Sequence, residues 1–172
     1  MHTWSREFSW QRVMTMTITF SDLTSKYNEY QKNMHPLFVV LLDTRGTMDE
    51  FAETTRDIKP ISFPVWLVVF LQRPGNPLEE YCRHPTDNVF NVDFKTRMLV
   101  LCYNHTILVE WYALRDNRTR TFDLATWSPD RGLILKTQKN LYDRRSNLFG
   151  EVLRVASVNV SSHLSRTLTC TV

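Results

Sequence analysis

Two apolar runs on either side of a helical pattern constrain this chain most strongly. LFVVLLD at residues 37–43 and PVWLVVFL at residues 64–71 each have the composition of a strand buried on both faces. The segment between them places apolar or small residues on one helical face: Met48, Phe51, Ala52, Thr55 and Ile58. A strand, a helix and a strand joined by short connections form a βαβ unit, with parallel strands and a right-handed crossover.

The start of the helix is predicted from Thr47-Met48-Asp49-Glu50. A threonine followed three residues later by a glutamate is the capping-box pattern, in which each side chain bonds the backbone N–H of the other residue. Pro60 predicts the end of the helix. We therefore expect a helix over residues 48–58 that packs on the sheet.

The flanking segments predict the rest of an α/β fold. MTMTITF at residues 14–20 alternates as a half-buried strand does, and Ser21 then caps a helix with one apolar face, formed by Leu23, Tyr27 and Tyr30. Beyond the loop RPGNP, three β-rich segments indicate an antiparallel meander, at residues 96–103, 106–114 and 119–127. The predicted fold is thus a set of βαβ units with a parallel sheet, followed by a meander.

Composition excludes several classes of protein. Apolar residues make up 42% of the chain and charged residues 23%, as in globular proteins. The net charge of +3 is scattered, so nucleic-acid binding is not expected. The longest apolar run is far shorter than the ~20 residues of a membrane span, and MHTWSREFSWQRV lacks the apolar region of a secretory signal. Motifs for phosphate binding, serine hydrolysis or zinc proteolysis are missing, so neither an enzyme nor a cofactor is expected.

Two cysteines and two histidines allow two interpretations. Cys82, His84, Cys102 and His105 are a possible tetrahedral zinc set, although the C-x-H half is shorter than the usual spacings. Alternatively, Cys82 and Cys102 form a disulfide, which requires an oxidising compartment and leaves Cys170 over.

Three sequons bear on the compartment. Asn104, Asn117 and Asn159 each begin an Asn-x-Ser/Thr sequence, and the first two lie at predicted turn tips where a glycan is tolerated. Asparagine is also a common turn residue without any modification.

The second half of the chain resembles a receptor family. FKTRMLVLCYNHTILVEWYALRDNRTRTFDLATW and GLILKTQKNLYDRRSNLFGEVLRVASV resemble the insect ionotropic receptors, the chemosensory branch of the glutamate-receptor-like channels. The match is to the amino-terminal domain of the ionotropic receptor 75a type. It covers roughly residues 13–158, and its most specific part is LYDRRSNLFGEVLRV, which contains the motif residues Arg144, Arg145, Asn147, Leu148 and Gly150.

The resemblance implies an organisation for the whole chain. Residues 1–12 are expected to be a disordered or incomplete start, residues 13–137 an α/β ectodomain like one lobe of a periplasmic binding protein, and residues 138–150 a linker helix that stops at Gly150. Residues 151–158 are expected to be the first strand of a ligand-binding domain that this chain does not contain, and residues 159–172 an atypical tail.

The resemblance also implies a function. The intact receptor would be an odorant-gated cation channel at the cell surface that senses carboxylic acids and assembles with co-receptor subunits. Its ligand contacts would lie beyond this chain, and the disulfide would then be favoured for Cys82 and Cys102. Arg144 and Arg145 are interpreted as a solvated pair near a helix C-terminus. The alternative is a free-standing α/β binding or decoy module.

Overall fold

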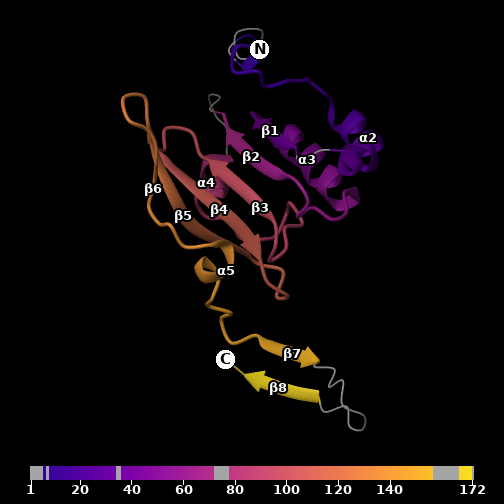
Figure 1. Cartoon of the computed structure of the whole chain (residues 1–172), viewed down its shortest axis with the longest axis vertical. Helices are drawn as coiled ribbons and strands as arrows, with labels where there is room; N and C mark the ends of the chain where they lie inside the picture. The colour runs from indigo at the N-terminus through magenta and orange to yellow at the C-terminus, as the bar shows by residue number, and fades with distance from the viewer. Residues whose placement is uncertain (1–5, 7, 34–35, 72–77, 157–166, 172) are drawn as a thin grey trace.

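A six-stranded mixed sheet, curled into half a barrel, organises the chain (Figure 1). The structure is a computed structural model, and it describes residues 6, 8–33, 36–71, 78–156 and 167–171. The strands follow one another across the sheet in chain order: β1 (Leu37–Leu42), β2 (Val65–Phe70), β3 (Arg97–Leu101), β4 (Ile107–Ala113), β5 (Thr119–Ser128) and β6 (Gly132–Leu135). The helices are α2 (Phe20–Asn33), α3 (Arg45–Asp57), α4 (Leu78–Arg83) and α5 (Leu141–Arg144).

The predicted α/β class is confirmed. β1 and β2 are parallel, with α3 between them in the chain, and β3 continues the parallel set after α4. From β3 onward each strand pairs antiparallel with the next, so the meander extends the same sheet. α4 and β6 were not predicted from the sequence, because each is too short to show a clear period.

The predicted strand at residues 14–20 is wrong. Residues 13–19 have no regular structure, and Met14 and Met16 are 87% and 64% exposed. Alternation alone does not make a strand when no neighbouring strand pairs with it. Ser21 is not the cap of α2 either, because the backbone N–H of Asp22 donates to the hydroxyl of Thr19 at 3.1 Å. The predicted apolar face of α2 is confirmed, since its three residues are buried: Leu23, Tyr27 and Tyr30.

The capping box of α3 lies one turn earlier than predicted. The N-cap is Thr44, whose hydroxyl accepts from the N–H of Thr47 at 3.2 Å. The hydroxyl of Thr47 in turn accepts from the N–H of Thr44 at 3.1 Å. Thr47 is therefore the third residue of the helix, and Glu50 is an exposed residue of the second turn. A threonine hydroxyl has taken the place that the pattern assigns to Glu or Gln.

Replacing Thr44 by alanine is expected to destabilise the protein by about 1 kcal/mol, because an N–H at the start of α3 loses its acceptor. Glu50→Ala should change stability by less than about 0.5 kcal/mol, as an exposed substitution does. Urea unfolding of both variants measures the difference. A larger loss of stability for Glu50→Ala than for Thr44→Ala would instead indicate that Thr47 and Glu50 form the cap.

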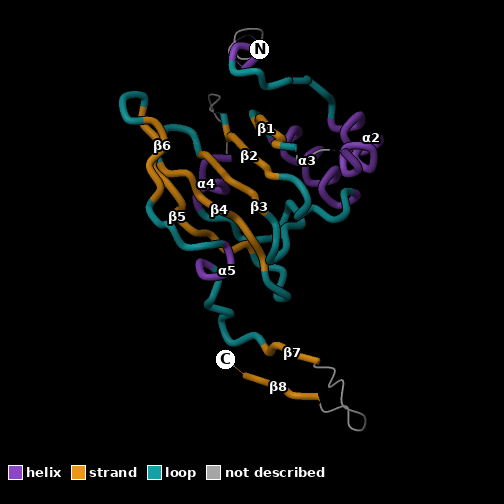
Figure 2. The backbone as a smooth tube through the Cα atoms, viewed as in Figure 1, coloured by secondary structure: helices purple, strands orange, loops and turns teal. Residues whose placement is uncertain are grey.

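The main core lies on one face of the sheet, beneath α2, α3 and α4. Phe51 of α3 is fully buried, and its ring contacts those of Phe20, Trp66 and Phe90 at centroid distances of 5.7, 5.6 and 4.8 Å. Tyr81 of α4 packs edge-on against Trp111 of β4. Figure 2 shows α2 and α3 together at the β1 end of the sheet.

β1 is not buried on both faces, contrary to the prediction. Its alternate residues Val40 and Leu42 belong to the core, whereas Leu37, Val39 and Leu41 are 58%, 42% and 39% exposed. The reason is that α3 returns the chain to the sheet on the core side, and no described helix covers the other side of β1.

Tyr27 provides a pH-dependent test of the α2 packing. Burial raises the pKa of Tyr27 to about 12, and its hydroxyl donates to the carbonyl of Pro60 at 2.8 Å. Above pH ~10 the unfolded chain loses this proton while the folded chain keeps it, so stability should fall between about pH 10 and 12. The free energy of unfolding of Tyr27→Phe should fall less steeply over that window. Parallel pH profiles for the two proteins would argue against a buried Tyr27.

Candidate functional site in the linker

The linker that follows β6 contains one helical turn, and hydrogen bonds from side chains to the backbone fix its conformation. Asn140 accepts from the N–H of Asp143 at 3.0 Å and begins α5, and Arg145 is already the C-cap. Asn147 then accepts from the N–H of Phe149 at 2.9 Å, which forms a local turn in place of further helix. The predicted helix over residues 138–150 is therefore wrong in length.

Gly150 is not a helix stop but part of the turn before β7. The φ angles of Phe149 and Gly150 are +52° and +81°, and the N–H of Glu151 donates to the carbonyl of Leu148 at 3.0 Å. Glycine is favoured in this left-handed region because it has no Cβ. The turn redirects the chain away from the sheet and into the next strand.

Glu110 is the residue to which the linker binds. It lies on β4 and is 1% exposed, although it is on the side of the sheet away from the main core. Arg144 donates two hydrogen bonds to this carboxylate: Nε is 3.1 Å from Oε2 and Nη2 is 2.9 Å from Oε1. Its third nitrogen, Nη1, donates to the carbonyl of Lys139 at 2.6 Å. This is the bidentate geometry that makes an arginine–carboxylate pair strong.

Arg145 is fully buried and reaches the same carboxylate. Its Nη2 lies 2.9 Å from Oε1 of Glu110 and donates to the carbonyl of Thr96 at 2.9 Å, while Nη1 donates to the carbonyl of Phe94. The guanidinium carbon is 4.5 Å from the centre of the Tyr112 ring, a cation–π distance. Arg145 therefore connects the linker to β4 and to the loop before β3.

The two arginines are not a solvated pair, so that interpretation was wrong. Both side chains turn inward because Glu110 and three backbone carbonyls supply the hydrogen-bond acceptors that water would otherwise provide. Two guanidinium groups share one carboxylate, and burial lowers the pKa of Arg145 while Glu110 opposes that change. We call Arg144, Arg145 and Glu110 the linker clamp.

A second attachment lies at the β4–β5 turn. Arg120 pairs with Asp116 and lies 4.5 Å from the centre of the Phe149 ring. Oε1 of Glu151 accepts from the N–H of Asp116 at 3.0 Å. The linker is thus held before and after its turn, and the start of β7 has a defined direction relative to the sheet.

Glu110 was missed in the sequence, although a signal was present. It is the one charged residue in the strand sequence ILVEWYA, where an unpaired carboxylate would be costly if buried. An acidic residue in such a strand indicates a basic partner elsewhere, and the tandem arginines were the available candidates. Whether the tandem arginines would be exposed to water or buried against Glu110 depended on the tertiary structure.

Cys82 of α4 and Cys102 beyond β3 form a disulfide, with Cα atoms 5.9 Å apart. Both sulfur atoms are therefore used, which removes the thiolates that the zinc alternative needs. Within the described part of the chain, no three His, Cys, Asp or Glu residues group as a metal site would require. The bond ties α4 to the sheet.

The asparagines of the three sequons differ in their structural environment. Asn104 and Asn117 are exposed, and their φ angles of +54° and +56° place them at tight turns before β4 and β5. The side chain of Asn117 accepts from Nδ2 of Asn88 at 2.8 Å, so its amide oxygen is engaged in the fold. Asn159 lies outside the described residues.

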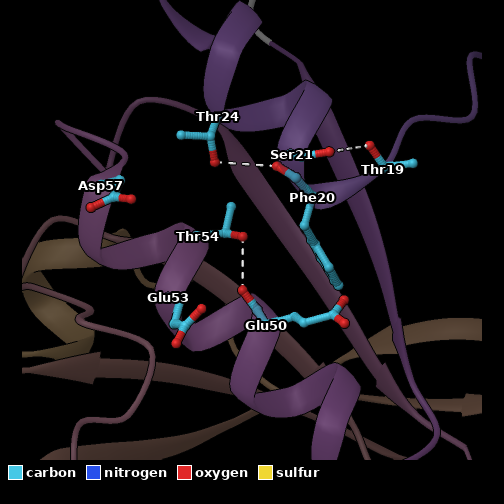
Figure 3. A pocket seen from close by; sticks show the side chains of 8 residues that line it. All are labelled: Thr19, Phe20, Ser21, Thr24, Glu50, Glu53, Thr54 and Asp57. Atoms are coloured by element: carbon cyan, nitrogen blue, oxygen red, sulfur yellow. Dashed lines mark hydrogen bonds between the residues drawn. The ribbon is translucent and has the colours of Figure 1, made fainter.

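A cavity of about 400 Å³ lies between α2 and α3, lined by Thr19, Phe20, Ser21, Thr24, Glu50, Glu53, Thr54 and Asp57 (Figure 3). Two of its threonine hydroxyls donate to carbonyls of their own helices, Thr54 to Glu50 at 2.8 Å and Thr24 to Phe20 at 3.2 Å. Three acidic residues line the cavity, so it would repel a carboxylate ligand.

The chain beyond the linker forms a separate two-stranded sheet. β7 (Val152–Ala156) pairs antiparallel with β8 (Thr167–Thr171), and Figure 1 shows this hairpin apart from the six-stranded sheet. A strand in the predicted tail was not expected from the sequence. Among the described residues, no helix has both the length and the apolar character needed to cross a bilayer.

Comparisons with known proteins give no assignment: no protein-family model, curated protein or solved structure matches the chain.

Proposed function

We propose that this chain is the amino-terminal extracellular portion of a chemosensory ionotropic receptor, a subunit of a ligand-gated cation channel that senses carboxylic acids. The linker clamp carries the proposal. Its arginines belong to LYDRRSNLFGEVLRV, the segment with the most specific resemblance to the family, and they hold the chain where the ligand-binding domain would begin.

The linker clamp would allow the linker to transmit movement between the amino-terminal domain and the proposed ligand-binding domain. A flexible connection would let a ligand-binding domain rotate freely against the amino-terminal domain. Here Glu110 holds both arginines, and Phe149 and Glu151 contact the β4–β5 turn. The following strand therefore leaves the sheet in one direction, which couples the two parts of a receptor mechanically.

The disulfide and the two exposed sequons support an extracellular setting. A disulfide persists in oxidising compartments, and Asn104 and Asn117 lie where a glycan could be attached. The cavity between α2 and α3 is lined by three acidic residues and would disfavour a carboxylate, which supports an odorant site in the proposed ligand-binding domain.

Full-length sequencing of the transcript tests the proposal. The expected message continues in frame from residue 158 into the rest of a ligand-binding domain and hydrophobic membrane segments. If every transcript instead ends after residue 172, the receptor proposal fails.

The alternative, a free-standing binding or decoy module, is favoured by one observation: β7 pairs with a strand of the chain's own tail. Limited proteolysis separates the two functions. Early cleavage between about residues 150 and 160 that leaves a stable core supports the receptor proposal, because proteases cut first at undocked termini. Protection of this segment until global unfolding supports the module.

A further inference from the structure

Two Asn-x-Thr sequons lie in the described part of the chain, and their sequences do not distinguish them. NHT at residues 104–106 and NRT at residues 117–119 both end in threonine and contain no proline. Asn104 and Asn117 are both exposed, and both lie in turns with positive φ angles. The hydrogen bonds around the two sequons, however, are different.

The sequon at residues 117–119 is bound to the loop before β3 through both of its defining residues. The side-chain oxygen of Asn117 accepts from Nδ2 of Asn88 at 2.8 Å. Asn88 is 9% exposed, and it exchanges two hydrogen bonds with the backbone of Val92. The hydroxyl of Thr119 donates to the carbonyl of Asp87 at 2.7 Å. The amide and the hydroxyl of this sequon are therefore both engaged in the fold.

The turn that carries Asn117 also holds the linker. The N–H of Asp116 donates to Glu151, and Arg120 lies against the ring of Phe149. A glycan is a bulky group, so one attached to Asn117 would be placed beside these contacts and beside Asn88. The β4–β5 turn is therefore a poor position for a glycan in the folded protein.

The sequon at residues 104–106 is open. Asn104 and Thr106 are exposed, and within the described part of the chain neither the amide of Asn104 nor the hydroxyl of Thr106 has a hydrogen-bond partner. The turn is fixed by its backbone, because the N–H of His105 donates to the carbonyl of Cys102 at 3.1 Å and Cys102 is in the disulfide. This β3–β4 turn lies at the other end of β4 from the turn that holds the linker.

We propose that, of these two sequons, Asn104 carries the N-glycan and Asn117 is a structural residue that stays unmodified in the folded protein. The inference rests on the extracellular setting of the proposed function, because N-glycans are attached to proteins of the secretory pathway. The glycan would extend from the end of the sheet that is remote from the linker.

The chemistry of attachment explains the preference. Nδ2 of the asparagine loses one proton and bonds to the anomeric carbon of an oligosaccharide, while the bond from that carbon to its lipid diphosphate carrier breaks. The lipid diphosphate leaves. At Asn117 this transfer competes with docking of the turn, which engages both the amide and the hydroxyl of the sequon. At Asn104 the transfer competes with no side-chain contact among the described residues.

Site occupancy of the full chain, secreted from cultured eukaryotic cells behind an added signal peptide, tests the proposal. Enzymatic removal of N-glycans in heavy-oxygen water converts each glycosylated asparagine into a labelled aspartate, which peptide mass spectrometry counts. Occupancy of Asn104 should exceed that of Asn117 at least about five-fold, because two hydrogen bonds hold the second sequon. A ratio near one, a preference for Asn117 or an unmodified Asn104 would overturn the proposal.

The added signal peptide separates this test from that of the receptor proposal. It delivers the chain to the secretory pathway whatever the native transcript encodes, so the occupancies decide only between the two asparagines. Sequencing of the transcript decides the receptor proposal independently.

Releasing Asn117 provides a second measurement. Asn88→Ala removes the donor to Asn117 and should raise the occupancy of Asn117 at least about three-fold, while that of Asn104 stays unchanged. If Asn88→Ala is not secreted, Asn88→Asp replaces it, because a carboxylate keeps the acceptor for the N–H of Val92 but cannot donate to Asn117. Unchanged occupancy of Asn117 in a secreted Asn88 variant would overturn the competition between docking and transfer.

The structural role of Asn117 has a matched control. Asn104→Gln and Asn117→Gln both place glutamine in a left-handed turn, so the backbone cost is similar and the difference reports on the contact with Asn88. Both variants are produced without glycans in the bacterial periplasm, where the disulfide forms. Asn117→Gln should lower the urea midpoint more than Asn104→Gln does. An equal or smaller decrease would overturn the structural assignment of Asn117.

Discussion

Replacing Glu110 by alanine is expected to lower the free energy of unfolding by about 3–5 kcal/mol, because two guanidinium groups lose their shared carboxylate. Arg145 is fully buried and has no route to water without moving the linker. Urea unfolding followed by circular dichroism measures the change. Glu110→Gln keeps the size of the side chain, so it separates the lost charge from the lost packing.

The matched control is Asp123→Ala. Asp123 also pairs with a basic residue, Lys136 at 2.9 Å, but both side chains are more than one third exposed. Water screens such a pair, so its loss should cost less than about 1 kcal/mol. If Glu110→Ala costs no more than Asp123→Ala, the linker clamp is not a buried charge cluster.

Replacing Phe51 by alanine is expected to destabilise the protein by a similar amount, about 3–5 kcal/mol, because a fully buried aromatic ring leaves a cavity beneath α3. The loss affects both α2 and the sheet, since the ring contacts Phe20 as well as Trp66. Thermal and urea unfolding should agree in direction.

The control for Phe51 is Glu53→Ala, on the exposed side of the same helix. Alanine is a good helix former, so this change should stay within about 0.5 kcal/mol. A Phe51→Ala variant as stable as Glu53→Ala would contradict the packing of α3 on the sheet.

The two variants also distinguish the two sides of the sheet. Phe51 tests the core that the βαβ pattern predicted, whereas Glu110 tests a polar cluster whose members lie far apart in the sequence. Loss of Phe51 should weaken the whole domain. Loss of Glu110 should in addition expose the linker to protease before global unfolding, because the clamp is what holds α5 to β4.

Local sequence was sufficient where sterics and periodicity act over a few residues. The helical spacing around Phe51 and the apolar runs of β1 and β2 predicted a parallel βαβ unit, and the structure contains it. Asn104 and Asn117 were predicted at turns and adopt the left-handed backbone that asparagine tolerates. Capping was less well predicted, because several adjacent threonines and serines could supply the same hydroxyl.

Only the tertiary structure determined whether the residues of β1 and the arginine pair are exposed or buried. The apolar run of β1 predicted burial on both faces, but burial depends on a second layer that strand sequence does not encode. The arginine pair is equally suited to water or to a buried carboxylate, and Glu110, some 34 residues away in the chain, determined the outcome. Periodicity is local and is therefore visible in the sequence, whereas the partner of a charge or of an apolar face is set only when distant segments meet.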